Sequence, residues 1–235
     1  MDYFYTPPGL VHRGELLIEG EEFAHLSHVM RKKAGDTVRV VDGQGNAYDV
    51  TILEISRQTA RCAINQTHTR LNEAGIEVTL GVGLLKNASR FDFLVEKATE
   101  LGVMSVVPLL TERTIGHHAK VERWQKLALA AMKQSGRSVL PRVQVPQHLP
   151  DFLGSVSAAM LRLLPDEKQE RPLLTDVLGG RTLSSVVICI GPEGGFSPHE
   201  VSHATSAGFT PVSLGPRRLR TETAALVAVA SVLTR

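Results

Sequence analysis

From residue 76 onward, the pattern of apolar and polar positions alternates between the periods of strands and of helices. Short runs rich in β-branched residues predict buried strands, and longer stretches with apolar residues on one face predict helices. The expected strands are 76–85, 103–110, 158–164 and 184–190, and the expected helices are 90–101 and 121–135. Such alternation is typical of a mostly parallel sheet covered by helices, so we expect an α/β fold.

The first 70 residues follow a different pattern, in which short strands dominate. Strands are expected over 15–18, 37–41, 47–55 and 59–64, with one amphipathic helix over 21–31. Several short strands with a single helix indicate a small β-barrel. The polar stretch 65–75 is interpreted as a linker. We therefore expect two domains, a β-barrel over residues 1–70 and an α/β domain over residues 71–235.

A glycine-rich loop, Gly-Pro-Glu-Gly-Gly at 191–195, joins the last of these strands to a further helix. Glycines tolerate positive φ and allow a ligand or another backbone to approach closely. Ser197 is the expected N-cap, Glu200 completes a capping box, and Phe196 and Val201 are spaced to form a hydrophobic staple. Ligands bind at the C-terminal ends of strands in α/β sheets, so this loop is the first place to look for a site.

A second strand, turn and helix follow near the end of the sequence. We expect the strand over 209–214, the turn at Gly215 and Pro216, and the helix over 221–235 with Thr221 as its N-cap. The helix body is almost wholly small and apolar. A helix that is apolar all round is buried on all sides, which indicates either a deep core or a subunit interface.

The composition, with 43% hydrophobic and 21% charged residues, is ordinary for a globular protein. No charge-free apolar run approaches the length of a membrane span, and the first residues lack a secretory signal pattern. The cysteines Cys62 and Cys189 lie far apart in apolar contexts, which favours packing roles and a cytoplasmic location. A net charge of +2 is too small to indicate nucleic-acid binding, so local clusters decide that question.

Basic residues recur at the ends of the expected elements, among them Arg31, Lys32, Lys86, Arg90 and Arg137. The simplest interpretation is solvated surface charge, with cations favoured at helix C-termini. The alternative is a surface for a phosphate backbone, because several of these residues fall in loops and at strand ends. Among the carboxylates Glu193 is unusual, since a charged side chain inside a glycine loop has no evident structural need.

The segment 199–203 matches the H-E-x-x-H pattern of zinc metalloproteases. Three observations speak against a metal site: the capping box already uses Glu200, the expected helix ends by Gly208, and no third ligand is evident. We expect no bound metal, and a zinc hydrolase using His199 and His203 is kept as a remote alternative.

Two segments, Ile-Gly-Pro-Glu-Gly-Gly-Phe-Ser at 190–197 and Leu-Gly-Pro-Arg-Arg-Leu-Arg-Thr-Glu-Thr-Ala at 214–224, resemble the signature motifs of the RsmE family. Its members are 16S rRNA uridine N3-methyltransferases of the SPOUT superfamily. Segments 97–103, 134–137 and 140–141 are similar to the middle motifs of the family, and 25–31 and 35–36 to its PUA-like N-terminal domain. The chain departs from the family pattern at Arg218, where an aliphatic residue is usual, and at Met30, where leucine is common.

This resemblance implies a C-terminal SPOUT domain with a trefoil knot, preceded by a PUA-like β-barrel. Periodicity could not have predicted a knot, because threaded chains are nearly absent from proteins. The implied cofactor is S-adenosylmethionine, held by the knot loops largely through backbone groups. The residues expected to bind it are Leu164, Pro165, Ile190, Gly191, Pro192, Glu193, Gly195, Leu214, Gly215, Leu219 and Arg220.

The resemblance also implies a substrate, an assembly and a mechanism. The substrate would be 16S rRNA, free or within the small ribosomal subunit, methylated at N3 of a uridine in the decoding region by a homodimer formed through the C-terminal helix. Arg220 would stabilise the uracil anion, and Glu222 would accept the proton or orient Arg220. The five basic residues named above would contact RNA. A SPOUT methyltransferase acting on tRNA or 23S rRNA is the nearest alternative.

Overall fold

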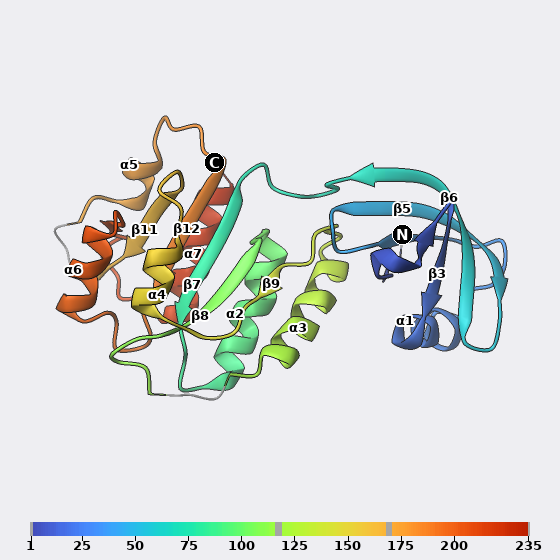
Figure 1. Cartoon of the computed structure of the whole chain (residues 1–235), viewed down its shortest axis with the longest axis horizontal. Helices are drawn as coiled ribbons and strands as arrows, with labels where there is room; N and C mark the ends of the chain where they lie inside the picture. The colour runs from blue at the N-terminus through green and yellow to red at the C-terminus, as the bar shows by residue number, and fades with distance from the viewer. Residues whose placement is uncertain (1, 116–118, 168–170, 235) are drawn as a thin grey trace. The chain divides into compact units, whose positions relative to one another are not determined.

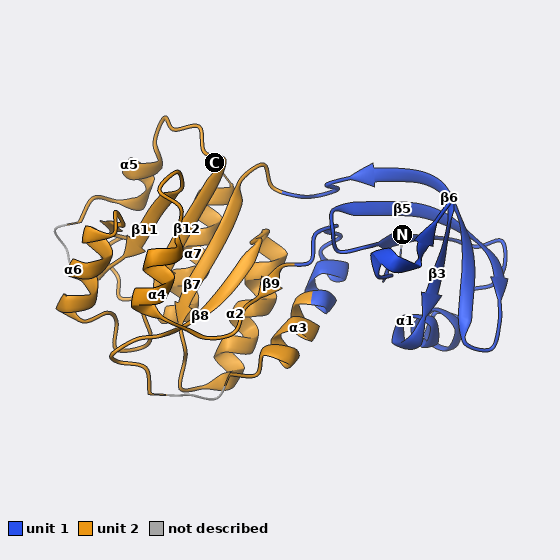
Figure 2. Cartoon of the chain, viewed as in Figure 1, with its two compact units in different colours: residues 1–73, 129–140 blue, residues 74–128, 141–235 orange. Residues whose placement is uncertain are grey.

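The computed structural model describes residues 2–115, 119–167 and 171–234, and the chain forms two compact units (Figure 2). Unit 1 comprises residues 1–73 and 129–140, and unit 2 comprises residues 74–128 and 141–235. This division differs from the expected boundary after residue 70. Residues 129–140 belong with unit 1 because Met132 is fully buried in a cluster with Val41 and Ala47.

The described part of unit 1 contains a six-stranded sheet in the order β1-β4-β5-β6-β3-β2, of which β3, β5 and β6 are labelled in Figure 1. The β1 and β4 strands are parallel, and the other neighbours are antiparallel. The strands are β1 (Tyr3–Tyr5), β2 (Val11–His12), β3 (Glu15–Glu19), β4 (Thr37–Val41), β5 (Asn46–Ile55) and β6 (Thr59–Thr69). The four expected strands are confirmed. The expected linker is wrong over its first residues, because β6 stays paired with β5 as far as Thr69.

The helix expected over 21–31 is shorter and changes its winding. It consists of α1 (Gly20–Ala24) followed by a π-helical turn, η2 (His25–Val29). A separate short 3-10 turn, η1 (Pro8–Leu10), lies before β2. Arg31 has a φ of 52°, so the backbone has left the helical region by that residue. Phe23 and Leu26 of this helical segment are buried in the same core as Val38 and Val40 of β4.

The described part of unit 2 contains a seven-stranded sheet in the order β10-β8-β7-β12-β11-β13, with β9 also paired to β8. Every pair is parallel, which confirms the α/β prediction. The strands are β7 (Glu77–Gly83), β8 (Ser105–Leu110), β9 (Arg142–Val143), β10 (Gln147–His148), β11 (Leu161–Pro165), β12 (Ser185–Ile190) and β13 (Thr210–Val212). Strand order alone does not define how a chain is threaded, so the knot stays a prediction.

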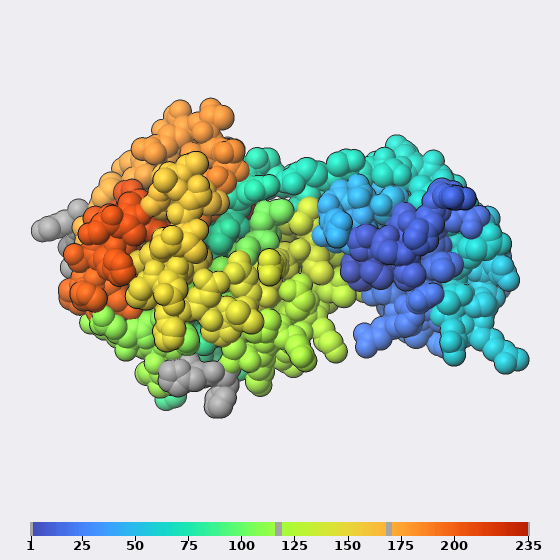
Figure 3. Space-filling model, viewed as in Figure 1, coloured from blue at the N-terminus to red at the C-terminus, as the bar shows by residue number. Residues whose placement is uncertain are grey.

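Helices cover both faces of this sheet: α2 (Ala88–Leu101), α3 (Val121–Gln134), α4 (Leu149–Ser155), α5 (Leu174–Leu178), α6 (Pro198–Ser206) and α7 (Thr221–Leu233). Val187 and Cys189 of β12 pack in one cluster with residues of α4 and α6, which lie side by side in Figure 3. Because side chains alternate along a strand, Val186 and Ile188 face the opposite layer, where α7 contacts α2. None of the described helices has the length and apolar character needed to cross a bilayer.

The helix α7 differs from expectation in two respects. Its N-cap is Arg220, which makes no side-chain capping bond, and Thr221 is the first helical residue. Within this single chain the helix is not buried on all sides, because Thr223 is exposed and Val227 is 38% exposed, so the deep-core alternative is wrong and the interface alternative stays a prediction. One face therefore forms core, and the other stays open on the surface of this chain.

Candidate functional site

The glycine loop 191–195 leaves the sheet at its centre, where β12 lies between β7 and β11. A Cβ at Gly191 would stand 2.9 Å from the carbonyl carbon of Gly195, so the loop folds back on itself at main-chain distance. A Cβ at Gly83, the last residue of β7, would stand 2.5 Å from the nitrogen of Pro192. These two positions require glycine because backbone, rather than movable side chain, occupies the space.

Two hydrogen bonds from neighbouring segments hold this loop. Glu193 Oε1 accepts the backbone N–H of Lys86 at 3.1 Å, and Arg113 Nη1 donates to the carbonyl oxygen of Gly194 at 2.7 Å. The carboxylate of Glu193 therefore has a structural partner that the sequence did not reveal. Arg113 lies in the loop after β8, and sequence analysis missed it because no local motif surrounds it.

The predicted capping box at the start of α6 is confirmed. Ser197 Oγ accepts the N–H of Glu200 at 3.1 Å, and Glu200 Oε2 accepts the N–H of Ser197 at 2.8 Å. Glu200 Oε1 also accepts the N–H of Glu112 at 2.8 Å, which ties the loop after β8 to this helix. Hydrogen bonds with Ser197 and His199 lower the pKa of the Glu112 carboxyl below its usual value.

These bonds count against a zinc site at 199–203. Both oxygens of Glu200 are occupied by backbone N–H groups, and His199 Nδ1 lies 3.1 Å from Glu112 Oε1. Within the described ranges, no three His, Cys, Asp or Glu side chains gather where they could hold a metal ion. Burial also raises the pKa of the Cys189 thiol, which favours a packing role for that cysteine.

A second wall is formed by residues 214–220, between β13 and α7. Gly215 has a φ of 107°, a conformation that side chains rarely adopt, and its N–H donates to Ser213 Oγ at 3.2 Å. On the glycine loop opposite, Gly195 has a φ of 67°. A Cβ built at either glycine would meet no heavy atom within 4 Å, so both main-chain positions border open space.

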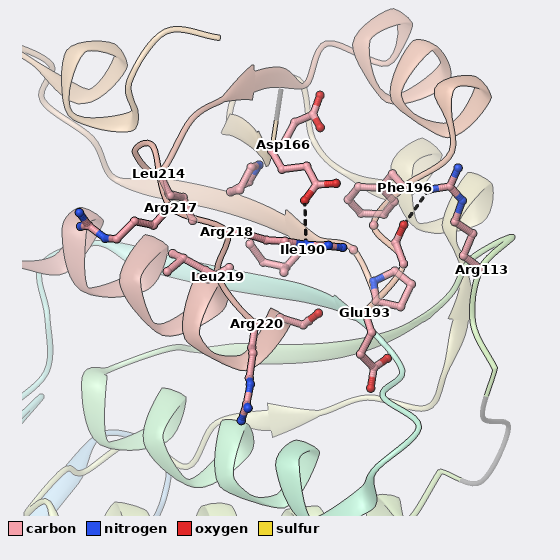
Figure 4. A pocket seen from close by; sticks show the side chains of 18 of the residues that line it. Arg113, Asp166, Ile190, Glu193, Phe196, Leu214, Arg217, Arg218, Leu219 and Arg220 are labelled. Carbon is pink, nitrogen blue, oxygen red and sulfur yellow. Dashed lines mark hydrogen bonds and ion pairs between the residues drawn. The ribbon is translucent and has the colours of Figure 1, made fainter. Parts of the chain in front are cut away.

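The two walls enclose a pocket of about 440 Å³, shown in Figure 4. This volume lies within the range of small-molecule sites. Pro165, Asp166 and Glu167, which follow β11, contribute a third side. Ten of the residues expected to bind the cofactor line the pocket, namely Pro165, Ile190, Gly191, Pro192, Glu193, Gly195, Leu214, Gly215, Leu219 and Arg220. The exception is Leu164, which is fully buried in the core beneath α4 and α6 because it points to the other face of β11.

Charged side chains surround the pocket, and positive charge predominates. Its lining includes five arginines, Arg90, Arg113, Arg217, Arg218 and Arg220, and three carboxylates, Asp166, Glu167 and Glu193. Each carboxylate is engaged: Asp166 with Arg171 at 3.3 Å, Glu167 with Arg218 at 3.3 Å, and Glu193 with the Lys86 N–H. A cationic pocket of this kind favours an anionic partner such as a nucleic acid.

No hydrogen bond or ion pair joins the two residues expected to be catalytic, both of which the structure describes. Arg220 is exposed and lines the pocket, whereas Glu222 is buried, 7% exposed, and is not part of the lining. The basic partner of Glu222 is Arg90, with 3.7 Å between Oε1 and Nε, rather than Arg220. Glu222 Oε2 is buried without a hydrogen-bond partner in the described part of the chain.

The residues expected to contact RNA are found in different environments. Arg90 lines the pocket, and the backbone of Lys86 contacts the glycine loop. In unit 1, Arg31 is exposed, and the Lys32 ammonium forms an ion pair with Asp2 at 2.8 Å.

The expectation for Arg137 is wrong. Its side chain is 2% exposed and forms an ion pair with Glu73, itself 1% exposed, at 2.7 Å. Glu73 Oε1 also accepts the N–H groups of Ser138 and Val139. Arg137 therefore stabilises unit 1 from within and is not available to a phosphate.

Comparison with known families agrees with this architecture. Residues 72–233 match the model of an RNA methyltransferase domain, and residues 18–65 match that of an RNA methyltransferase PUA domain. The parallel sheet, its pocket at the strand ends and the preceding β domain thus define an RNA methyltransferase.

Individual relatives narrow this class. The chain is 37% identical to a ribosomal RNA small subunit methyltransferase E of Synechocystis, over 88% of this chain and 69% of that protein. It is 31% identical to the protein of that name from Aquifex aeolicus, over 99% of both. The solved structure of a ribosomal RNA small subunit methyltransferase E from Neisseria gonorrhoeae, bound to S-adenosyl methionine, matches with a TM-score of 0.87 and 29% identity, over 100% of this chain and 97% of that one. The chain belongs to the ribosomal RNA small subunit methyltransferase E family.

Proposed function

We propose that this protein uses S-adenosylmethionine to methylate N3 of a uridine in the 16S rRNA of the small ribosomal subunit. The observation that carries the proposal is the meeting of two distant glycine-proline segments, 191–195 and 214–220, around one pocket. Family membership and the S-adenosyl methionine bound to the Neisseria gonorrhoeae relative support the same assignment.

The residues of the pocket fit this cofactor. Gly195 and Gly215 leave open space where any side chain would project, so a flat nucleoside could lie against the main chain there. Ile190, Leu214 and Leu219 offer apolar surface beside them. When bound, S-adenosylmethionine supplies an electrophilic methyl group on a positively charged sulfur.

Arg220 is proposed to act on the uracil. The N3 atom of uracil carries a proton and is a poor nucleophile until that proton is lost. A guanidinium beside a ring carbonyl would stabilise the negative charge that develops during deprotonation. Arg220 suits this role because it is exposed to the pocket and forms no ion pair with a carboxylate among the described residues.

Glu222 is proposed to contribute by orienting an arginine. Its buried carboxylate approaches Arg90, which lines the pocket, and would fix the direction of that guanidinium. The orphaned Oε2 can accept one further hydrogen bond, so proton acceptance by Glu222 is retained as the alternative role. Arg31, Lys32 and Lys86 are proposed to contact RNA phosphates.

The proposal includes a homodimer and a cytoplasmic location. The open face of α7, with Thr223 and Val227, offers small and apolar side chains for a second copy of the helix.

The target base must leave its stack to reach the pocket, which is easiest in a loop or a partly single-stranded region.

Replacing Arg220 with alanine tests the mechanism. Methylation of small ribosomal subunits should fall by about 100-fold to 1,000-fold, as for the loss of one oxyanion-stabilising donor. Cofactor affinity by calorimetry should change far less than turnover, because the cofactor is expected to contact mainly the backbone of this segment, and the midpoint of urea unfolding should stay near the wild-type value. The matched control is Arg181→Ala, which removes an exposed arginine of the same unit that does not line the pocket. Wild-type turnover in the Arg220 variant would refute its assignment.

The RNA target is tested separately. Mass-spectrometric mapping of ribosomal RNA from cells with and without this protein should reveal one missing N3-methyluridine in 16S rRNA. A missing mark in 23S rRNA or tRNA instead would favour the alternative substrate. Binding of RNA without any binding of S-adenosylmethionine would contradict the enzymatic proposal altogether.

A further inference from the structure

We propose that Arg113 is an RNA-contacting positioning residue that couples RNA binding to the shape of the glycine loop. In this proposal, the Arg113 guanidinium donates hydrogen bonds both to the Gly194 carbonyl and to a phosphate group of the substrate RNA. The inference rests on the proposed function, because it assigns a role in recognising the RNA of that same site.

The position of Arg113 is defined by the loop that carries it. Thr111 N–H donates to Thr114 Oγ1 at 2.9 Å, and the two threonine hydroxyls lie 3.0 Å apart, so the turn around Arg113 is closed by its own side chains. Glu112 N–H is held by the buried carboxylate of Glu200. The arginine therefore extends from a fixed base even though its side chain is exposed.

The side chain of Arg113 lies along the glycine loop. A Cβ built at Gly194 would be 3.4 Å from Cβ and Cδ of Arg113, which places the arginine stem in van der Waals range of that residue. Nη1 donates to the Gly194 carbonyl at 2.7 Å, as the dashed line in Figure 4 marks. Any movement of the guanidinium is therefore transmitted to the main chain that lines the pocket.

The guanidinium retains capacity for a second partner. It offers five N–H donors in a planar fork, and the Gly194 carbonyl is its one hydrogen-bond acceptor among the described residues. Arg90 and Arg218, by contrast, each form an ion pair with a carboxylate. The charge of Arg113 interacts with the neighbouring Glu112 carboxylate, which is hydrogen-bonded to His199, but no ion pair joins the two among the described residues. Arg113 thus keeps free donors, which match a phosphate oxygen pair.

The location of Arg113 opposite Arg220 favours RNA as the partner. In Figure 4 the two arginines lie apart, Arg113 from the loop after β8 beside Phe196, and Arg220 below Leu219. A nucleotide whose base is close to Arg220 would have its backbone near the rim, where Arg113 is exposed. Phosphate binding there would stabilise the bond to Gly194, and the cofactor loop would become more ordered as a result.

Coupling of this kind is reciprocal, so RNA should raise the affinity for the cofactor by the same factor as the cofactor raises the affinity for RNA. The probe is S-adenosylhomocysteine, which cannot donate a methyl group, with small ribosomal subunits purified from cells lacking this protein. In the wild type, we expect saturating subunits to lower the dissociation constant of S-adenosylhomocysteine by about tenfold, a coupling of about 1.4 kcal/mol.

Three variants at Arg113 test whether its charge carries the coupling. Arg113→Gln removes the charge, and its side chain is two bonds shorter than that of arginine, so it should lose the coupling. Arg113→Ala should lose the coupling and also bind the probe more weakly when alone. Arg113→Lys should restore part of the coupling, because it restores the charge. Arg181→Ala removes an exposed arginine elsewhere in the unit and should behave as the wild type.

The outcomes distinguish this inference from the proposed function. Wild-type protein that fails to bind S-adenosylhomocysteine or to methylate the subunits would overturn the proposed function. Wild-type protein that binds and methylates, with coupling that persists unchanged in Arg113→Ala or Arg113→Gln, would overturn the role of Arg113. Coupling in Arg113→Lys that is no greater than in Arg113→Gln would show that charge at this position does not carry the coupling, and would overturn it as well.

Discussion

Replacing Gly83 with alanine should impair cofactor binding far more than it impairs folding. The new Cβ would stand 2.5 Å from the nitrogen, 2.6 Å from Cδ and 3.0 Å from Cα of Pro192. Ordinary contacts between carbon and these atoms are about 3.5 Å, so the loop must move by roughly 1 Å. The stability cost of such overpacking is about 1–3 kcal/mol. A misplacement of about 1 Å costs about 100-fold in rate where groups position reacting atoms, and we expect a loss of cofactor affinity of similar order.

The assay measures S-adenosylmethionine affinity by calorimetry and unfolding by urea titration for the same preparations. Gly81→Ala is the matched control, because it adds the same methyl group to the same strand. Its Cβ would meet the side chains of Phe152, at 3.0 Å, and Leu109, at 3.1 Å, rather than the pocket loop. We expect the control to lose stability while keeping its affinity. Wild-type affinity in Gly83→Ala would show that close packing of the loop on β7 does not shape the site.

Three further predictions concern stability. Arg137→Ala should destabilise the protein by about 3–5 kcal/mol in urea titrations, because it leaves the Glu73 carboxylate buried without its counter-ion; a loss of RNA affinity at unchanged stability would contradict this. Arg39 holds the pKa of Asp49 at about 2, below the ordinary 3.8, so this pair should contribute stability above pH 4 that is lost as the pH falls toward 2. In Asp49→Asn, the free energy of unfolding should therefore fall by roughly 1–2 kcal/mol less than in the wild type between pH 4 and pH 2. The same fall in both proteins would refute the pairing. Ser197→Ala should cost about 1 kcal/mol by removing the cap of α6, whereas the exposed Ser202→Ala should not.

Features that depend on neighbouring residues could be predicted from the sequence. The capping box needs only Ser197 and Glu200, three positions apart, and the structure contains both of its hydrogen bonds. The parallel sheet follows from alternating strands and helices, and it was also predicted correctly. The short strands β9 and β10, with two residues each, were missed because two residues contain no periodic signal.

Features that depend on distant residues could not be predicted in this way. The burial of Arg137 requires an ion pair with Glu73, which is 64 positions away. The residues next to Arg137 in the sequence do not indicate which carboxylate it pairs with. The role of Glu193 likewise depends on a backbone N–H 107 positions away. That 191–195 and 214–220 form one site was predicted only from the family resemblance. Even that resemblance placed both Leu164 and Pro165 in the site, whereas Leu164 is in the core because adjacent residues of a strand face opposite sides.

The two walls of the pocket follow strands that differ in length and in the number of strands they pair with. This difference should decide which wall moves when a ligand enters. The glycine loop follows β12, a six-residue strand hydrogen-bonded on both sides, whereas segment 214–220 follows β13, which has three residues and pairs with β11 alone among the described strands. Amide protons at the end of β12 should therefore exchange with solvent only on global unfolding, and those of β13 through local opening. The nucleoside would then enter the pocket through movement of segment 214–220, which contains the arginines. The glycine loop 191–195 would keep its conformation.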